Sequence, residues 1–232
     1  MKVAIMQPYL FPYIGYFQLV NAVDKFIFYD DVTFIKQGWI NRNRILLDDK
    51  EHLITIRLNG ASSNRLINEI AVSQKNDNLI KTIIQAYSKA PFFNETIPLI
   101  QNVFTEMKCL NKISKIAEIS VKMVSEYLNL NTIFETSSEV YTATKHLKKE
   151  ERLIAICKKN NADTYINPSG GKDLYNKSSF SKEGINLLFI KNHITGYKQF
   201  KNAFIPGLSI IDVTMFNSHN QLREMVCQYE LE

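Results

Sequence analysis

Side chains that could bind an anionic or hydroxylated ligand are densest in one short stretch near the N-terminus. Lys36, Arg42 and Arg44 supply three cations there, and Trp39 and Asn41 add an indole and an amide. Arginine forms bidentate hydrogen bonds to phosphate or carboxylate, and an indole stacks on a base or a sugar. A solvated arginine face is the ordinary alternative, but the density of these groups favours an anion site.

The preceding stretch, QPYLFPYIGYF, connects a short apolar run at 3–6 to a helix that Pro12 would begin. A loop between a strand and a helix offers free backbone N–H groups at the positive end of the helix dipole, which suits phosphate. Gly15 would let a ligand approach the backbone closely. We therefore take Gln7, Tyr13 and Tyr16 as further candidate ligand contacts, although aromatic packing is an equal explanation for the rings.

The tetrapeptide YIGY at 13–16 occupies the position that H-x-G-H has in nucleotidylyltransferases and class I synthetases. In those proteins the imidazoles bind nucleotide phosphates and stabilise charge in the transition state. Both histidines are tyrosines here, and a phenol can hydrogen-bond phosphate but supplies no cation. The similarity is therefore one of position in the fold.

Three residues are candidates for proton transfer. Asp30 and Asp31 end an apolar strand at 26–29, and His193 follows a later one. A carboxylate at a strand end can act as a base or hold Mg²⁺. The alternative is a purely structural role, in which it caps a helix or a turn. The chain has no H-x-x-x-H or H-x-H spacing, so no metal site is predicted.

A second polar loop, NPSGGK at 167–172, follows a predicted strand. Asn167, Gly170 and Gly171 could form a close-approach loop for phosphate. The spacing is not that of a P-loop, and a plain turn explains the loop equally well.

Composition narrows the class of protein. The 232 residues are 45% hydrophobic and 22% charged, with a net charge of +5 that is scattered along the chain. No basic run argues for nucleic acid, and no apolar stretch reaches the ~18 residues of a membrane span. Three isolated cysteines and the lack of a signal peptide favour a cytoplasmic protein with reduced thiols.

The apolar periodicity predicts an α/β fold with a Rossmann-like βαβ start, a mixed sheet and a helical insertion. We predict one domain over 1–232, with the insertion at 77–130. Its ligand site should lie outside the carboxyl ends of the strands. Predicted strands are 3–6, 26–29, 39–47, 52–58, 132–135, 164–167 and 187–190, with a further apolar run at 208–211; predicted helices are 77–90, 95–107, 112–128, 147–160 and 220–229.

Four blocks in this order, QPYLFPYIGYF, DKFIFYDDVTFIKQGWINRNRI, YINPSGGKDLY and FIPGLSIIDVTMFN, resemble the WbqC-like family. The resemblance covers nearly the whole chain. It implies a role in bacterial surface polysaccharide (O-antigen, lipopolysaccharide) biosynthesis, as a transferase that moves an acyl or aminoacyl group onto a nucleotide-linked amino sugar. Coenzyme A, an acyl carrier protein, and ATP with Mg²⁺ and a free acid all remain open as donors.

In this hypothesis Lys36, Arg42 and Arg44 hold the pyrophosphate, and Asp30 or Asp31 acts as the base. Two other functions fit the same residues. One is a nucleotidylyltransferase-like, ATP-dependent enzyme, and the other is a non-catalytic subunit that binds a nucleotide-sugar.

Overall fold

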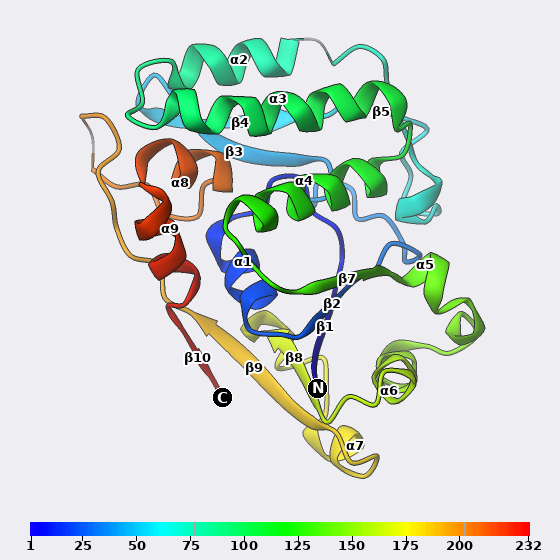
Figure 1. Ribbon diagram of the computed structural model, residues 1–232. Coiled ribbons are helices and arrows are strands. Elements are labelled where there is room, and N and C mark those ends of the chain that lie inside the picture. Colours follow the sequence, from blue (N-terminus) through cyan, green and yellow to red (C-terminus); the bar gives the residue numbers. More distant parts are fainter. Residues whose placement is uncertain (77, 202) are drawn as a thin grey trace.

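The computed structural model describes residues 1–76, 78–201 and 203–232, and its centre is a six-stranded sheet (Figure 1). The strand order is β10-β9-β8-β1-β2-β7. All neighbouring pairs are parallel except β9 and β10. The strands are β1 (Lys2–Met6), β2 (Lys25–Phe28), β7 (Ile133–Thr136), β8 (Thr164–Pro168), β9 (Asn186–Asn192) and β10 (Tyr229–Leu231).

The chain builds this sheet outward from β1 in both directions. It adds β2 and β7 on one side and then returns to place β8 and β9 on the other. The order reverses between β1 and β8, and such a switch point opens a crevice at the carboxyl ends of the strands. The predicted Rossmann-like α/β fold is confirmed.

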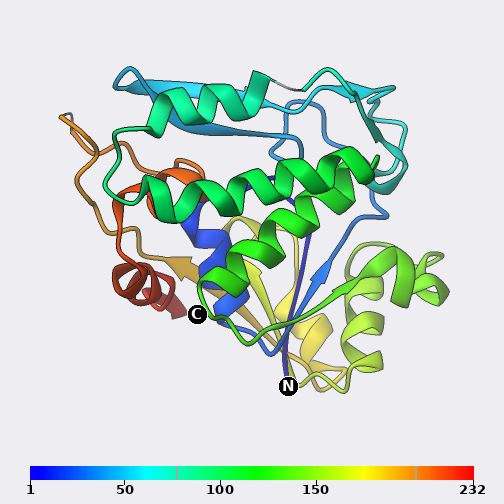
Figure 2. The ribbon, with the colours of Figure 1, turned by 45° about the horizontal axis from the view of Figure 1, so that its top comes forward.

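Alternation along β1 explains why helices cover both faces of the sheet. Val3 and Ile5 point into one core, which α6 (Lys149–Lys159) and α7 (Lys177–Ser181) cover. Ala4 points into the other, covered by α1 (Ile14–Asn21), α4 (Ile113–Tyr127) and α9 (His219–Val226). Both helical layers can be followed in Figure 2. Successive strand residues face opposite sides, so β1 is buried on both faces.

A second unit lies beyond the carboxyl edge of the sheet, at the top of Figure 1. The hairpin of β3 (Arg42–Leu47) and β4 (Lys50–Thr55) packs through β3 against α2 (Asn78–Tyr87) and α8 (Ile210–Phe216). Asp48 and Asp49 both have positive φ, as a tight hairpin turn requires. The remaining elements are β5 (Leu58–Asn59), β6 (Ala71–Val72), α3 (Phe93–Cys109), α5 (Ser137–Val140) and the 3₁₀ turns Ile67–Glu69, Thr142–Thr144 and Ser169–Gly171.

The structure corrects several predicted boundaries. The strand predicted at 39–47 begins only at Arg42, because the chain bends over residues 38–41, and the strand predicted at 52–58 is divided between β4 and β5. The apolar run 208–211 leads into α8, since the Ser209 hydroxyl accepts from the N–H of Ile211 and caps a helix there. The helix predicted to 229 ends at Val226, and β10 follows.

Residue 77, where the predicted insertion and its first helix would begin, lies outside the described residues. The insertion at 77–130 therefore stays a prediction. Within the described part of the chain, every helix is too short or too polar to cross a bilayer.

Candidate functional site

A cavity of about 250 Å³ lies at the carboxyl edge of the sheet, where three segments distant in sequence meet. These are the β1–α1 loop, the start of β3 with the turn before it, and the chain after β9. Aromatic rings, a guanidinium and two apolar side chains form the walls. The lining residues are Tyr9, Pro12, Tyr13, Trp39, Asn43, Arg44, Ile194 and Gly207.

The β1–α1 loop is held in a strained conformation by hydrogen bonds from other elements. Phe11 has a φ of 40°, in the left-handed region that non-glycine residues avoid. Asn43 Nδ2 donates to the carbonyls of Leu10 (3.1 Å) and Phe11 (2.7 Å). Ser209 Oγ also donates to the Phe11 carbonyl (2.7 Å), and Ser120 Oγ accepts from the Phe11 N–H (3.0 Å). Strain of this kind persists only where the surroundings over-determine it, which is typical of functional loops.

The end of β9 fixes the other side of the loop. The Tyr13 hydroxyl donates to Asn192 Oδ1 (3.2 Å), and Asn192 Nδ2 donates to the Gly15 carbonyl (3.1 Å) and to Gln18 Oε1 (2.8 Å). A Cβ on Gly15 would lie 2.3 Å from the Tyr13 ring. The glycine therefore makes room for Tyr13, rather than for a ligand.

Tyr16 is directed away from solvent. It is buried, and its hydroxyl donates to the Gln7 carbonyl (2.8 Å). Burial raises the pKa of this phenol well above its usual value. Tyr16 thus ties the end of β1 to α1 and does not line the cavity.

Trp39 forms one wall of the cavity, and two arginines stack near its ring. The Arg44 and Arg42 guanidinium carbons lie 5.4 and 5.9 Å from the ring centroid. Arg42 donates to the carbonyls of Gln37 and Gly38, so it stabilises the turn that presents Trp39.

Arg44 reaches the cavity itself. It pairs with Glu51 (2.9 Å) and donates to the Gly207 carbonyl (3.2 Å). Its Nε is buried and has no hydrogen-bond partner among the described residues. Buried donors are nearly always paired, so this N–H is an exception, and a ligand acceptor would reach it only after the side chain moves.

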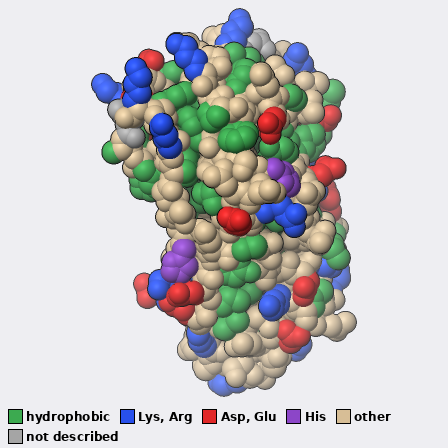
Figure 3. All heavy atoms as spheres, turned by 60° about the vertical axis from the view of Figure 1, so that its left-hand side comes forward, with side chains coloured by type: hydrophobic (Ala, Val, Ile, Leu, Met, Phe, Trp, Pro, Cys, Tyr) green, Lys and Arg blue, Asp and Glu red, His purple; other side chains and the backbone are tan. Residues whose placement is uncertain are grey.

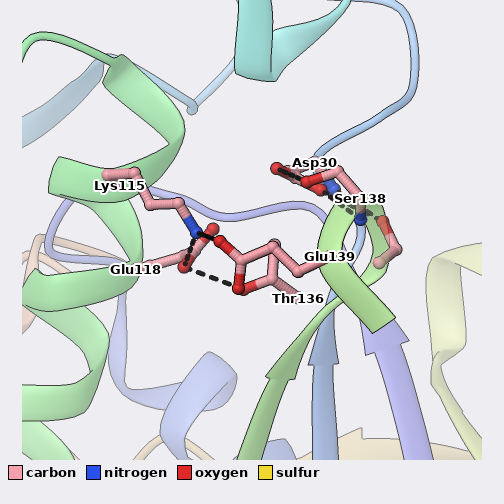
Figure 4. A network of polar contacts seen from close by, with 7 residues as sticks. Asp30, Lys115, Glu118, Thr136, Ser138 and Glu139 are labelled. Carbon is pink, nitrogen blue, oxygen red and sulfur yellow. Dashed lines mark hydrogen bonds and ion pairs between the residues drawn. The ribbon is translucent and has the colours of Figure 1, made fainter. Parts of the chain in front are cut away.

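A different polar cluster occupies the carboxyl ends of β2 and β7. Asp30 is fully buried and accepts from the Ser138 N–H (3.0 Å) and hydroxyl (2.8 Å), while the Ser137 hydroxyl lies 3.1 Å away (Figure 4). Asp31 accepts from Ser137 (2.5 Å) and pairs with Arg152 (2.6 Å). Both carboxylates are occupied by protein donors, and neither lines the cavity.

The neighbouring side chains are also paired, although one oxygen of Glu118, Oε1, is buried without a hydrogen-bond partner among the described residues. Lys115 bridges Glu118 (3.1 Å) and Glu139 (2.5 Å), and Thr136 donates to Glu118 (2.9 Å) (Figure 4). Burial raises the pKa of the Glu118 carboxyl. Within residues 1–76, 78–201 and 203–232, no three His, Cys, Asp or Glu side chains are grouped to hold a metal ion.

The sequence profile of the WbqC-like protein family matches residues 7–224. The chain belongs to the WbqC-like protein family. It is 28% identical to an uncharacterized protein of Mycobacterium tuberculosis, Rv1507c, over 222 residues, which cover 93% of each chain. Comparison with solved structures gave no significant match. The matched region of this WbqC-like protein includes the loop, the Trp39–Arg44 segment and the switch point.

Three of the predicted site residues meet in the cavity: Tyr13, Trp39 and Arg44. The others lie outside its lining. Asn41 donates to the Ile56 carbonyl (2.8 Å), whereas the side chain of Lys36 is exposed. Gln7, Arg42 and the buried Tyr16 support the surrounding loops.

The predicted loop after β8 is also separate from the cavity lining. Asn167 Nδ2 donates to the Tyr165 hydroxyl (2.6 Å), and a Cβ on Gly171 would lie 2.2 Å from Asn167 Oδ1. No heavy atom lies within 4 Å of a Cβ built on Gly170. His193 is exposed beside the cavity residue Ile194, with Nε2 3.3 Å from Glu230.

Sequence reasoning missed the residues that build the cavity without carrying charge. Asn43 stands between Arg42 and Arg44, so the sequence does not distinguish it from its polar neighbours, and its burial and its bonds to the loop carbonyls follow only from the fold. Ile194, Gly207 and Ser209 lie far from the motif in sequence, and only the fold brings them to it.

Proposed function

We propose that this WbqC-like protein is a transferase that modifies a nucleotide-linked amino sugar, by acyl or aminoacyl transfer, in bacterial surface-polysaccharide biosynthesis. The observation that carries the proposal is the cavity, whose lining brings Trp39, Tyr9 and Tyr13 together with Arg44, an arginine whose buried Nε has no hydrogen-bond partner among the described residues. Family membership agrees with this function without specifying it.

The size of the cavity limits which part of the ligand it holds. A volume of about 250 Å³ accommodates a nucleobase or a single sugar ring, but not a whole nucleotide-sugar. In this proposal the ring stacks on Trp39 or the tyrosines, and the guanidinium of Arg44 donates to one of its oxygens. The phosphates extend toward the N-terminus of α1, beside Tyr13, where the backbone N–H groups favour an anion.

The charge distribution supports an anionic ligand. On the face that is turned to the left in Figure 1, Lys and Arg side chains gather toward the top, and few acidic side chains lie among them (Figure 3). Such an excess raises the local concentration of a negatively charged substrate.

The transfer step needs a base. The sugar amine attacks the acyl carbonyl, a C–N bond forms, the bond to the donor's sulfur or phosphate oxygen breaks, and the amine proton passes through the base to the leaving group. Of the three predicted candidates, His193 has an exposed side chain and precedes the cavity residue Ile194 in sequence, whereas Asp30 and Asp31 are buried and bonded within the protein. We therefore assign the base role to His193.

Ligand-induced stabilisation tests the binding part of the proposal. We expect UDP-glucosamine, UDP-galactosamine or dTDP-4-amino-4,6-dideoxyglucose, which each carry a free sugar amine, to raise the Tm of the wild type in a concentration-dependent way, and Trp39→Ala to abolish the shift. Leu53→Ala removes another exposed hydrophobic side chain that does not line the cavity, so it should keep the shift. No shift with any of the three would contradict the proposal.

Two other results would favour the alternative functions. A shift that needs ATP and Mg²⁺ together would favour a nucleotidylyltransferase-like reaction. Nucleotide-sugar binding without amide formation from coenzyme A, carrier-protein or ATP-activated acyl donors would favour a non-catalytic subunit. If His193→Gln keeps both affinity and turnover, His193 is not the base.

A further inference from the structure

A larger hollow, of about 760 Å³, lies on the helical layer between α3, α2 and the segment around β6. It shares no lining residue with the cavity at the sheet edge. Its lining consists of Val72, Ser73, Gln74, Asn76, Ile80, Gln101, Asn102, Phe104, Thr105, Met107, Lys108, Leu110 and Asn111.

The walls of the hollow are rich in amides and poor in charge. Gln74, Gln101, Asn102 and Asn111 have side chains without a hydrogen-bond partner in the described part of the chain. Lys108 is the one charged residue of the lining, although 22% of the chain is charged. An amide offers both a donor and an acceptor, which matches a hydroxyl group that also does both.

The floor of the hollow is apolar. Phe104 is 8% exposed, and Ile80, Met107 and Leu110 are partly buried beside it. Apolar surface with a few convergent polar groups is typical of ligand sites. The C–H face of a sugar ring can lie on such a floor while its hydroxyls reach the surrounding amides.

We propose that this hollow is a second ligand site, which binds the sugar rings of a neutral oligosaccharide between the free amides of α3 and the segment around β6. The lining has no carboxylate to bind a cation and only Lys108 to bind an anion, so its neutral amides favour an uncharged ligand. The volume is sufficient for more than one ring. The proposal goes beyond the proposed function, because it concerns a separate surface and requires no transfer chemistry.

Side-chain amide signals give the most direct test. The full-length ¹⁵N-labelled protein is titrated with maltotriose, chitotriose and mannotriose, and the NH₂ resonances of Gln101 and Asn102 are followed. We expect at least one trisaccharide to shift both pairs saturably. The double variant Gln101→Ala/Asn102→Ala should weaken its binding at least tenfold. Asn94→Ala removes another exposed amide of α3, outside the hollow, and should leave binding unchanged.

Each remaining outcome overturns the proposal. If none of the three sugars shifts these resonances, or if the double variant binds as well as the wild type, the hollow is not a saccharide site. Shifts produced by an uncharged acetyl-trialanine amide and not by the sugars would assign the hollow to a peptide. Trp39→Ala should leave trisaccharide binding intact, so failure of the nucleotide-sugar site and failure of this one are distinguishable.

Discussion

Two polar clusters at the carboxyl edge of the sheet show that neighbouring strand ends can have different uses. We call the group around Asp30 and Asp31 the closed cluster, and the group of Tyr13, Trp39, Asn43 and Arg44 at the cavity the open cluster. At the ends of β2 and β7, Asp30 and Asp31 have protein donors at both carboxylates and are buried. At the end of β1, the loop is held by its backbone carbonyls, while Tyr13 and Trp39 keep part of their surface on a cavity. A strand-end position therefore does not identify a site by itself; what matters is whether its groups are already satisfied.

We expect the largest effect from a substitution that breaks the closed cluster. Arg152→Ala leaves Asp31 buried without its partner, and losing one member of a buried ion pair costs about 3–5 kcal/mol. Urea unfolding measures this loss. The folded fraction of the variant should bind nucleotide-sugar as the wild type does. Loss of affinity in that fraction would mean that the closed cluster takes part in the site.

We expect the next largest effect from a substitution that removes hydrogen bonds from the open cluster. Asn43→Ala removes two hydrogen bonds to the loop carbonyls, so we expect a loss of about 2–3 kcal/mol in stability together with weaker ligand binding. Asn41→Ala is the matched control, because it removes a single bond, to the Ile56 carbonyl. It should cost about 1 kcal/mol and keep the affinity. Equal affinity losses in both variants would contradict a specific role for Asn43.

A third change tests the close packing of Gly15 against Tyr13. Gly15→Ala gains about 0.5–1 kcal/mol of helix propensity, but overpacking the Tyr13 ring costs about 1–3 kcal/mol, so the variant should be less stable. In a Tyr13→Ala background the clash is gone, and the same change should stabilise. Thermal unfolding of the wild type, the two single variants and the double variant gives the coupling energy between the two positions. If Gly15→Ala stabilises the protein in both backgrounds, the Tyr13 ring moves away from the new Cβ without cost.

The smallest effect concerns a third group of polar residues, which surrounds Asp212 of α8. Asp212 is buried and accepts from the hydroxyls of Tyr87 (2.8 Å) and Tyr197 (2.6 Å) and from Gln199 (2.6 Å). Burial raises the pKa of this carboxyl above 3.8, against the opposing effect of the three donors. The folded state therefore binds its proton more tightly than the unfolded state does.

The direction of this pKa shift determines how the stability of the protein depends on pH. The stability contributed by the protonated Asp212 is fully present below pH 3.8 and declines as the pH rises toward the folded pKa. Asp212→Asn lacks this decline, so the stability of the wild type relative to the variant should fall as the pH rises above 3.8. Urea unfolding of both proteins across that pH range measures this change. A wild type that becomes more stable relative to the variant as the pH rises would contradict the raised pKa.

The sequence predicted the strands of the sheet better than it predicted which polar residues are free to contact a ligand. Apolar runs and alternation located every parallel strand of the sheet, and the residues Tyr13, Trp39 and Arg44 were named as candidates. Asp30 and Asp31 looked equally reactive in sequence, because nothing in a linear pattern reveals that Ser137 and Arg152 will occupy them. The strain at Phe11 depends on Ser120 and Ser209, which only folding brings to the loop.

Emission from the single tryptophan reports on the open cluster directly, since Trp39 is the only indole of the chain and lines the cavity. Titration with the nucleotide-sugar that stabilises the protein most should change Trp39 fluorescence saturably, with the same midpoint as calorimetry, and Asn43→Ala should move both midpoints together. Calorimetric binding that leaves Trp39 emission unchanged would place the ligand elsewhere and contradict the account.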